Sequence, residues 1–471
     1  MSDTSNLKTF IQGSSVLLIS NIIIKGIQFF LLPLYTNKLS PEMLGVSDSV
    51  TTLTGFLFPV LVMGLDSAYS AFYFEDEENH QNKVFSSIVF MLGIMAVIPT
   101  VACFFSQFWS ELLFKTSDNA YVMLIALLSV TANLIYLPLS LEVRLQNKMF
   151  AYSVVAVVSS ATTVILNILF LTFFDLGIYA LILSTLIVNI IQIILFSFAV
   201  SKKFSIQYVD KQLLKRMLTY SCPMLPSTLA TLILTLSDRY IVLYYWGEQA
   251  VGMYGIGNRF VAIVSVVISA VNTAYTTFAY SSYKKPGAKE QFSLVLNVLY
   301  IFMVGVAFVV TIFSKEIISL MTAPEYSMAY KTLSDMMFSQ VIYTLYVITC
   351  YGVLFEKKSK YVLVATSTGA LVNVILNITF IPHYGIVAAA FTTLIGYVIM
   401  LFINYYNSQR LYPCPYGMKK IILHFFCMYM IVKIMIEESF WLRMVITVIC
   451  AIFTLFIYRK KVAKSFTLFR D

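Results

Sequence analysis

Charged residues, histidines and paired cysteines are scarce in this chain of 471 residues, whereas apolar residues make up 59% of it. Charged residues amount to 12%, about half of the roughly 25% that is usual in soluble proteins. The three histidines are far apart, and the six cysteines show no CxxC spacing. These scarcities argue against a soluble domain, a metal cluster and a disulfide framework. They indicate an integral membrane protein.

The apolar segments predict helices rather than a barrel. Backbone groups in hydrocarbon must be bonded within the protein, so spans are helices or closed barrels. Runs such as 84–106 and 175–200 are too long and too continuously apolar for barrel strands. At about 20 residues per crossing we predict an all-α membrane protein with fourteen spans. These spans are 12–35, 43–65, 84–106, 119–141, 151–174, 176–199, 218–245, 251–278, 292–314, 331–353, 362–381, 384–406, 419–436 and 440–457. The first span is too long for a cleaved signal peptide, so we expect it to be retained.

An internal repeat organises these spans. The stretch Val-Ile-Leu-Asn-Ile at 164–168 recurs at 374–378, with Gly177 and Gly385 following the two copies. Spans 5 and 6 thus pair with spans 11 and 12, which gives two parallel six-helix repeats related by an axis along the membrane normal. We predict an N-terminal lobe (1–200), a cytoplasmic inter-lobe linker (201–217), a C-terminal lobe (218–410) and an appended helix pair with a basic tail (411–471). Two halves of similar build are typical of a secondary transporter.

The net charge of +9 follows the membrane topology. With a cytoplasmic amino terminus, most lysines and arginines fall in the inner loops and the carboxyl-terminal tail, as the positive-inside rule requires. The outer loops then carry Lys38, Lys115, Lys315, Lys331 and Arg443. We therefore expect both termini to be cytoplasmic and no nucleic-acid partner.

The candidate ionisable residues within the predicted spans are Lys25, Asp48, Asp238, Arg239 and Arg259. A charge at the bilayer centre costs at least about 2.5–3.5 kcal/mol, so such residues usually mark a transport pathway. Helical spacing places Asn21, Lys25 and Gln28 on one polar face of span 1, and Asn258 belongs to a similar stripe on span 8. Since the repeat makes spans 1 and 2 the counterparts of spans 7 and 8, we expect these faces to line one polar cavity. Three cations and two acids there suit an anionic substrate.

Structural alternatives exist for these residues. Asp238 and Arg239 point in different directions and could each pair with another helix. Asp48 could be a hydrated residue near a helix end, and Lys25 could extend its long stem toward the surface. We assign substrate binding to six residues and ion coupling, with H⁺ or Na⁺, to two. The substrate-binding residues are Lys25, Arg259, Arg239, Asn21, Gln28 and Asn258, and the coupling carboxylates are Asp48 and Asp238.

Motifs at the start of the second half resemble those of one transporter family. They are the proline-rich stretch 220–226, the Ser-Asp-Arg-Tyr-Ile stretch 237–241 and the stretch 251–259, which contains Val-Gly-Met-Tyr. Leu44-Gly45-Val46-Ser47 looks like the first-half counterpart of Val-Gly-Met-Tyr. Together they resemble the polysaccharide-type (Wzx-like) flippases of the multidrug/oligosaccharidyl-lipid/polysaccharide (MOP) exporter superfamily.

The resemblance implies a V-shaped two-lobe transporter in the bacterial inner membrane that works by alternating access. It implies transfer of an undecaprenyl-pyrophosphate-linked oligosaccharide to the outer leaflet, with membrane lipids and polysaccharide polymerase or chain-length machinery as partners and no cofactor. Lys25, Arg239 and Arg259 would contact the pyrophosphate, although Lys25 stands where an arginine is expected and offers no bidentate fork. Lipid II flippases are a second candidate, but the arginine-rich first helix expected of them is absent. A cation-coupled multidrug exporter would favour an acidic cavity, and a membrane enzyme would need catalytic features that the chain does not display.

Overall fold

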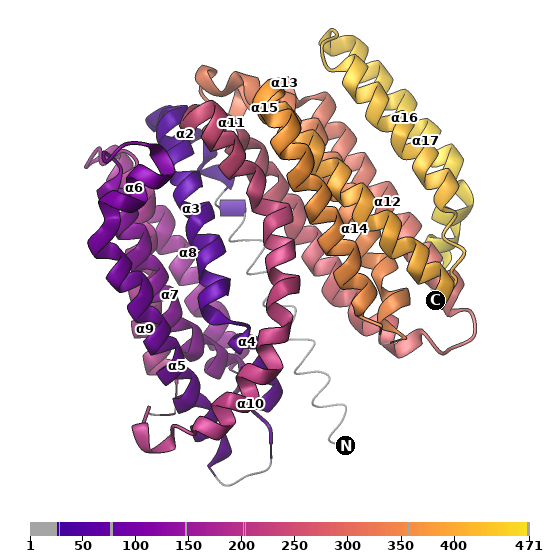
Figure 1. Ribbon diagram of the computed structural model, residues 1–471. Coiled ribbons are helices and arrows are strands. Elements are labelled where there is room, and N and C mark those ends of the chain that lie inside the picture. Colours follow the sequence, from indigo (N-terminus) through magenta and orange to yellow (C-terminus); the bar gives the residue numbers. More distant parts are fainter. Residues whose placement is uncertain are drawn as a thin grey trace. The chain divides into compact units, whose positions relative to one another are not determined.

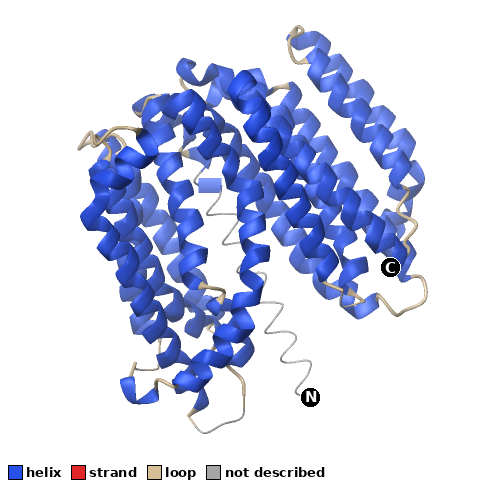
Figure 2. Cartoon of the chain, viewed as in Figure 1, coloured by secondary structure: helices blue, strands red, loops and turns tan. Residues whose placement is uncertain are grey.

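The computed structural model describes residues 26–27, 29–75, 79–146, 148–200, 202, 204–356 and 358–468. Within these ranges every regular element is a helix, and no strand occurs (Figure 2). The prediction of an all-α protein is therefore confirmed. The predicted first span, 12–35, lies mostly outside the described ranges.

The chain forms two compact units, which Figure 1 colours along the sequence. Unit 1 comprises residues up to Leu232 together with Gly247–Gly252, and unit 2 comprises Ile233–Trp246 and Met253–Asp471. All three boundaries fall within one long helical stretch, Leu225–Ser282 (α11). The segment 201–217, which we predicted to be a linker, contains the short helix Ile206–Tyr208 and most of α10 (Lys211–Ser221). Helix α10 packs against two helices of unit 1, α4 (Leu65–Phe72) and α5 (His80–Ala102).

Unit 1 is built around one central helix, α7 (Ala120–Leu145), which packs against α3, α5 and α9. Besides α10, unit 1 contains α2 (Leu32–Lys38), α3 (Pro41–Val62), α4 (Leu65–Phe72), α5 (His80–Ala102), α6 (Ser106–Phe114), α8 (Met149–Thr172) and α9 (Tyr179–Ala199). Short 3₁₀ turns occupy Cys103–Phe105 and Cys222–Met224.

The ends of α3 follow from its sequence. Ser40 caps its amino terminus by accepting a hydrogen bond from the Met43 N–H at 3.3 Å, and Pro41 occupies the first helical position. At the other end Met63 and Gly64 both adopt left-handed backbone conformations, with φ of 53° and 70°. Two such residues stop the helix and redirect the chain into α4.

Unit 2 has α14 (Tyr330–Leu354) at its centre, packed against α12 (Ala288–Ile312) and α15 (Lys360–Leu411). It also contains α13 (Ser314–Met321), the 3₁₀ turn Pro324–Ala329, α16 (Met418–Met435) and α17 (Phe440–Leu468). In the most apolar window of the stretch that contains α14, 83% of residues are buried, against 11% for α17. Helix α14 is therefore the core of this unit, and α17 lies at its edge with α16 (Figure 1).

Helices α11 and α15 each fold back on themselves at a glycine. In a straight helix Asp238 and Tyr254 would lie about 24 Å apart, and Asn377 and Thr392 about 22 Å. Both pairs are instead hydrogen-bonded. The breaks lie midway between the partners, at Gly247 (φ 74°) and Gly385 (φ 60°), where a side chain would strain the backbone.

Ten helical stretches among the described residues are long and apolar enough to cross a membrane. They are Pro41–Val62, His80–Phe114, Ala120–Leu145, Met149–Thr172, Tyr179–Ala199, Thr228–Ser269, Ala288–Ile312, Pro324–Leu354, Lys360–Leu411 and Phe440–Arg459. The stretches with fold-backs, Thr228–Ser269 and Lys360–Leu411, each supply two of the predicted spans. Helix α16 coincides with predicted span 419–436 but, with three lysines, is not among the ten. The total of fourteen stays a prediction.

Candidate functional site

The predicted site residues fall into three groups in the structure. Asn21, Lys25 and Gln28 lie outside the described residues. Asp48 belongs to unit 1, on α3. Asp238, Arg239, Asn258 and Arg259 belong to unit 2, all on the two arms of α11. The single predicted cavity therefore stays a prediction.

Asp238 is the centre of a buried polar cluster in unit 2. Its side chain is 3% exposed and accepts hydrogen bonds from the Tyr254 hydroxyl, the Arg239 backbone N–H at 2.8 Å and the Thr393 hydroxyl at 3.4 Å. These donors come from both arms of α11 and from α15. A carboxylate buried at this depth requires such donors, because an unsatisfied one would be strongly destabilising.

The cluster continues along α15 through side-chain amides. The Asn373 amide donates to Thr393 at 3.4 Å, and the Asn377 amide donates to the Asn373 carbonyl at 3.0 Å. Thr392 then donates to Asn377 across the fold-back at Gly385. Asn377 is the asparagine of the repeated stretch 374–378. Its counterpart Asn167 in unit 1 donates to the Tyr35 hydroxyl at 2.6 Å, so both copies use this residue to join helices.

The predicted basic residues of unit 2 lie on the two arms of α11. Arg239 and Arg259 are both half-buried. Arg259 lies five residues beyond Tyr254, which is about 7.5 Å farther along the helix. Asn258, between them, donates to the Tyr254 backbone carbonyl at 3.4 Å. Unit 2 thus carries one buried acid and two half-buried cations on the two arms of α11, and their roles in binding and coupling stay predictions.

In unit 1 the polar face of α3 lines a small cavity of about 150 Å³ between α3, α7 and α9. Its polar lining residues are Ser47, Thr51, Thr54, Ser129, Asn133 and Thr185. These groups are neutral hydroxyls and an amide, which can bind the hydroxyl groups of an uncharged ligand. Asp48 is half-buried on the same helix and does not line this cavity.

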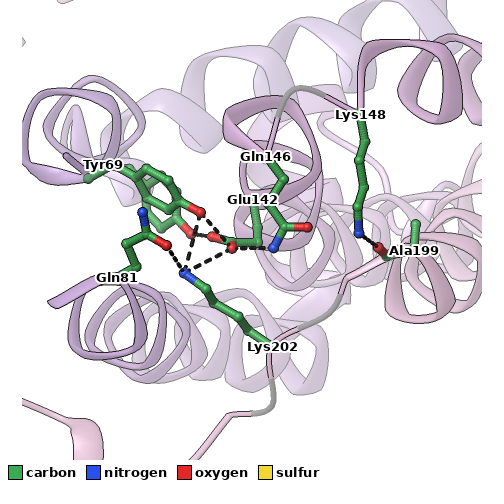
Figure 3. Close-up of polar contacts among 8 residues, drawn as sticks. Tyr69, Gln81, Glu142, Gln146, Lys148, Ala199 and Lys202 are labelled. Carbon is green, nitrogen blue, oxygen red and sulfur yellow. Dashed lines mark hydrogen bonds and ion pairs between the residues drawn. The ribbon is translucent and has the colours of Figure 1, made fainter. Parts of the chain in front are cut away.

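A second buried carboxylate, which the sequence analysis did not identify, lies in unit 1 (Figure 3). Glu142 is fully buried and accepts hydrogen bonds from Tyr69, from Tyr73 at 2.8 Å and from Gln146 at 2.6 Å. Lys202 lies 3.3 Å from the same carboxylate. The cluster joins α4 and α7 to the connection that follows α9.

The geometry of the Glu142 cluster suits a structural anchor. Lys202 also donates to the Gln81 side-chain carbonyl on α5 at 2.9 Å (Figure 3). Burial lowers the pKa of the Lys202 ammonium, although Glu142 opposes that shift. Burial raises the pKa of the Tyr73 hydroxyl, and the hydrogen bond that this hydroxyl donates to Glu142 raises the pKa further. Both tyrosines therefore remain neutral donors at physiological pH.

The appended helices are attached to unit 2 through charged pairs. Asp335 on α14 is fully buried and accepts hydrogen bonds from Tyr429 at 2.5 Å and Lys433 at 2.8 Å, both on α16. Arg443 on α17 donates to Glu316 through two nitrogens. His424 on α16 is buried and contacts the hydroxyls of Tyr300 at 2.8 Å and Thr454 at 2.9 Å.

Two apolar grooves border these appended helices. One, of about 280 Å³, lies between α14, α15 and α16, and its lining includes Val398, Leu401, Phe402 and Phe425. The other, of about 260 Å³, lies between α12, α16 and α17. Within the described residues no group of three or more metal-binding side chains occurs.

Comparisons with known proteins agree with this architecture. Residues 10–279, more than half of the chain, match the sequence profile of the family described as polysaccharide biosynthesis protein, and residues 223–379 match the MatE family. An uncharacterised membrane protein of Methanocaldococcus jannaschii is 23% identical over 448 residues, which cover 88% of this chain and 86% of that protein. Lsg locus putative protein 1 of Haemophilus influenzae is 22% identical over 285 residues, covering 59% and 68% of the two chains.

Solved structures show the same fold at low sequence identity. The lipid II flippase MurJ, in an inward closed conformation, has a TM-score of 0.77 at 18% identity, covering 96% of this chain and 100% of that one. An inward-facing multidrug resistance MATE family transporter of the MOP superfamily has a TM-score of 0.68 at 13% identity, covering 83% and 94%. The chain therefore belongs to the polysaccharide biosynthesis protein family and is a multi-pass membrane transporter of the MOP superfamily.

Proposed function

We propose that this protein is a flippase that moves an undecaprenyl-pyrophosphate-linked oligosaccharide repeat unit, of an O-antigen, capsule or exopolysaccharide, from the cytoplasmic to the outer leaflet. The match to the polysaccharide biosynthesis family over residues 10–279 is the observation that carries the proposal. The host membrane is the bacterial inner membrane, with both termini cytoplasmic.

Three features of the two units support a substrate with three chemically different parts. The half-buried Arg239 and Arg259 of unit 2 suit the pyrophosphate, since guanidinium groups bind phosphate oxygens in pairs. The neutral polar cavity of unit 1 suits sugar hydroxyls. The apolar groove beside α16 suits the polyprenyl tail. Removing that tail from an apolar surrounding costs about 0.8 kcal/mol per CH₂, so a path that keeps it in contact with apolar residues is favoured.

The roles of individual residues follow from this assignment. We assign the pyrophosphate to Lys25, Arg239 and Arg259, and the adjoining sugars to Asn21, Gln28 and Asn258. Asp238 and Asp48 are assigned to ion coupling, with H⁺ or Na⁺ as the coupling ion. Asp238 is suited to this role because its donors come from three helical segments, and a change in its charge would alter all of these contacts together.

Two alternative substrates are favoured by specific observations. Lipid II is favoured by the likeness to MurJ over 96% of this chain, which includes the appended helices. A cationic drug is favoured by the MatE match over residues 223–379, the region that holds Asp238. Both alternatives retain the transporter fold and differ in what the cavity binds.

Deletion of the gene separates these possibilities. If the proposal is right, undecaprenyl-linked repeat units accumulate on the cytoplasmic face, and surface polysaccharide is lost while cell-wall synthesis continues. Accumulation of lipid II would favour the second candidate. Unchanged levels of both lipids, together with greater sensitivity to cationic drugs, would favour the third and contradict our proposal.

A further inference from the structure

The small cavity of unit 1, of about 150 Å³ between α3, α7 and α9, has an unusual lining for the inside of a membrane protein. Six of the eleven described residues that line it are polar, the other five are aliphatic, and none of the eleven is charged or aromatic. An engineered apolar cavity of about 150 Å³ binds benzene, so this volume is sufficient for one six-membered ring. Because half of the lining is polar, the ring that fits here carries polar substituents.

The cavity has a buried floor and an accessible mouth. Ser47 and Ser129 are each 5% exposed and lie at the floor, whereas Thr51 and Thr185 are exposed and lie at the mouth. In the predicted topology α3, α7 and α9 all start at the outer face of the membrane. The polar lining residues lie roughly 9–20 Å along their helices from those starts. They are therefore at the depth of the hydrocarbon, where polar side chains require partners.

Half of the polar side chains already donate their protons within their own helices. The hydroxyls of Thr54, Ser129 and Thr185 each donate to a backbone carbonyl three or four residues earlier, at 2.9–3.0 Å. Each of these oxygens keeps lone pairs that can accept a hydrogen bond. These three groups therefore serve a ligand as acceptors.

The other three polar side chains are available as donors. Ser47, Thr51 and Asn133 make no side-chain hydrogen bond to any part of the chain that the structure describes. Asn133 is half-buried on α7, and its amide can donate two hydrogen bonds as well as accept. The cavity thus offers donors at three groups and acceptors at all six, without a formal charge.

We propose that this cavity binds one neutral sugar residue of the transported oligosaccharide and that Asn133 is a specificity-determining residue. Sugar hydroxyls both donate and accept, which matches the polar lining, and the aliphatic residues fit the C–H faces of the ring. A uronic acid would bring a carboxylate to a site without a cation, and an amino sugar would bring an ammonium to a site without an acid. Each charge would lose its hydration without gaining a charged partner. This inference rests on the proposed transport function and names the class of sugar that the cavity recognises.

Labelling of a cysteine at the mouth tests binding without transport. In a variant of the purified protein that lacks the six native cysteines, Thr185→Cys is modified with a maleimide in the presence of soluble probes. The probes are the methyl glycosides of glucose, galactose and mannose, compared with methyl glucuronoside at the same concentration. We expect at least one neutral glycoside to slow labelling and the glucuronoside to leave it unchanged. Labelling that no neutral glycoside slows, or that the glucuronoside slows equally, would overturn the proposal.

A matched pair of substitutions assigns the protection to the cavity. Asn133→Leu removes the amide and should abolish the protection by the neutral glycoside. Asn119→Leu is the control, because Asn119 is also half-buried on α7, makes no side-chain cap hydrogen bond and does not line the cavity. Protection that persists in Asn133→Leu would contradict the role of Asn133.

Transport by the full chain tests the specificity in its proposed setting. Two undecaprenyl-pyrophosphate-linked disaccharides, one of neutral hexoses and one of hexuronic acids, are compared in proteoliposomes. We expect the neutral lipid to move faster, and Asn133→Leu to slow it about tenfold, as the loss of one or two hydrogen bonds implies. Asn119→Leu should transport normally, and equal slowing by both substitutions would contradict the proposal. Failure of the unmodified protein to transport either lipid would instead contradict the proposed function, and the labelling result would still report on the cavity.

Discussion

Tyr254 donates a hydrogen bond to Asp238 across the fold-back at Gly247, so that a buried carboxylate joins the two arms of α11. The two residues lie on opposite sides of the break, and the Thr393 hydroxyl adds a contact from α15. A single acid thereby fixes three helical segments of unit 2. A change in the charge of Asp238 would consequently alter its contacts with all three segments.

Substitutions of Asp238 and Tyr254 should distinguish the contribution of this hydrogen bond to stability from the role of Asp238 in ion coupling. Tyr254→Phe leaves Asp238 short of one donor, and we expect a loss of about 1–3 kcal/mol in the free energy of unfolding. Asp238→Asn keeps an oxygen that accepts from Tyr254, so we expect near-normal stability but transport that no longer responds to an imposed ion gradient. Thermal unfolding and gradient-driven uptake in proteoliposomes measure the two effects. Gradient-dependent transport by Asp238→Asn would remove Asp238 as the coupling residue.

The Glu142 cluster should behave as an anchor of unit 1. Lys202→Met leaves the Glu142 carboxylate buried without its cation, and breaking a buried pair in this way costs about 3–5 kcal/mol. Glu142→Gln/Lys202→Met removes both charges and should recover most of the stability. The melting temperatures of the two variants in detergent measure this difference in stability. Equal destabilisation of both would show that the charge pair is not what anchors the segment after α9.

The groove beside α16 should influence transport of long lipid tails. Val398 lines the groove and is 41% exposed, so Val398→Trp fills the space without disturbing the core. We expect this variant to transport a substrate with a full-length polyprenyl tail more slowly than one with a short tail. Val364→Trp, on the same helix and 51% exposed, is the control. An equal effect of the two tryptophans would indicate that the groove does not bind the tail.

The attachment of α17 should weaken in acid. Burial raises the pKa of Glu316, but hydrogen bonds from Arg443 outweigh this effect, and the pKa lies below its ordinary value of 4.5. Because the folded-state pKa is the lower one, the stabilisation is present above about pH 4.5 and is lost as the pH falls through the folded-state value. Glu316 is 39% exposed, so the contribution is modest, about 1 kcal/mol or less.

Thermal unfolding across the acidic range measures this contribution. The melting temperature of Glu316→Gln should lie below that of the unmodified protein at pH 7, and the difference should vanish in acid. Glu325→Gln, at an exposed position in the neighbouring 3₁₀ turn, provides the control. A difference that persists at low pH would assign the effect to packing rather than charge.

Local sequence patterns predicted the helices well because membrane spans have strong length and hydropathy signals. The repeat also singled out Gly385 and Asn377, which the structure uses at a fold-back and in the buried network. Asp238 was identified because a carboxyl group within a span is unusual. Its principal donor, Tyr254, was part of a recognised motif. Because the chain is rich in aromatic residues, the sequence did not single out this tyrosine as the donor.

The Glu142 cluster could not be predicted in the same way. Tyr69, Glu142 and Lys202 are separated by more than 50 residues at each step and come together only when α4, α7 and the segment after α9 pack. Glu142 also lies near the end of a span, where a charged residue is ordinary. The pairing of Asp335 with Lys433 was missed for the same reason, because it joins the core of unit 2 to an appended helix.

Transport of a fluorescent undecaprenyl-pyrophosphate-linked oligosaccharide by the purified protein in proteoliposomes tests the central claim most directly. We expect the unmodified protein to move it between leaflets, and Lys25→Ala and Arg259→Ala to insert normally and lose this activity. Arg259→Lys, which keeps the charge but not the bidentate fork, should retain part of it. Full transport by both alanine variants, or none by the unmodified protein, would contradict the account.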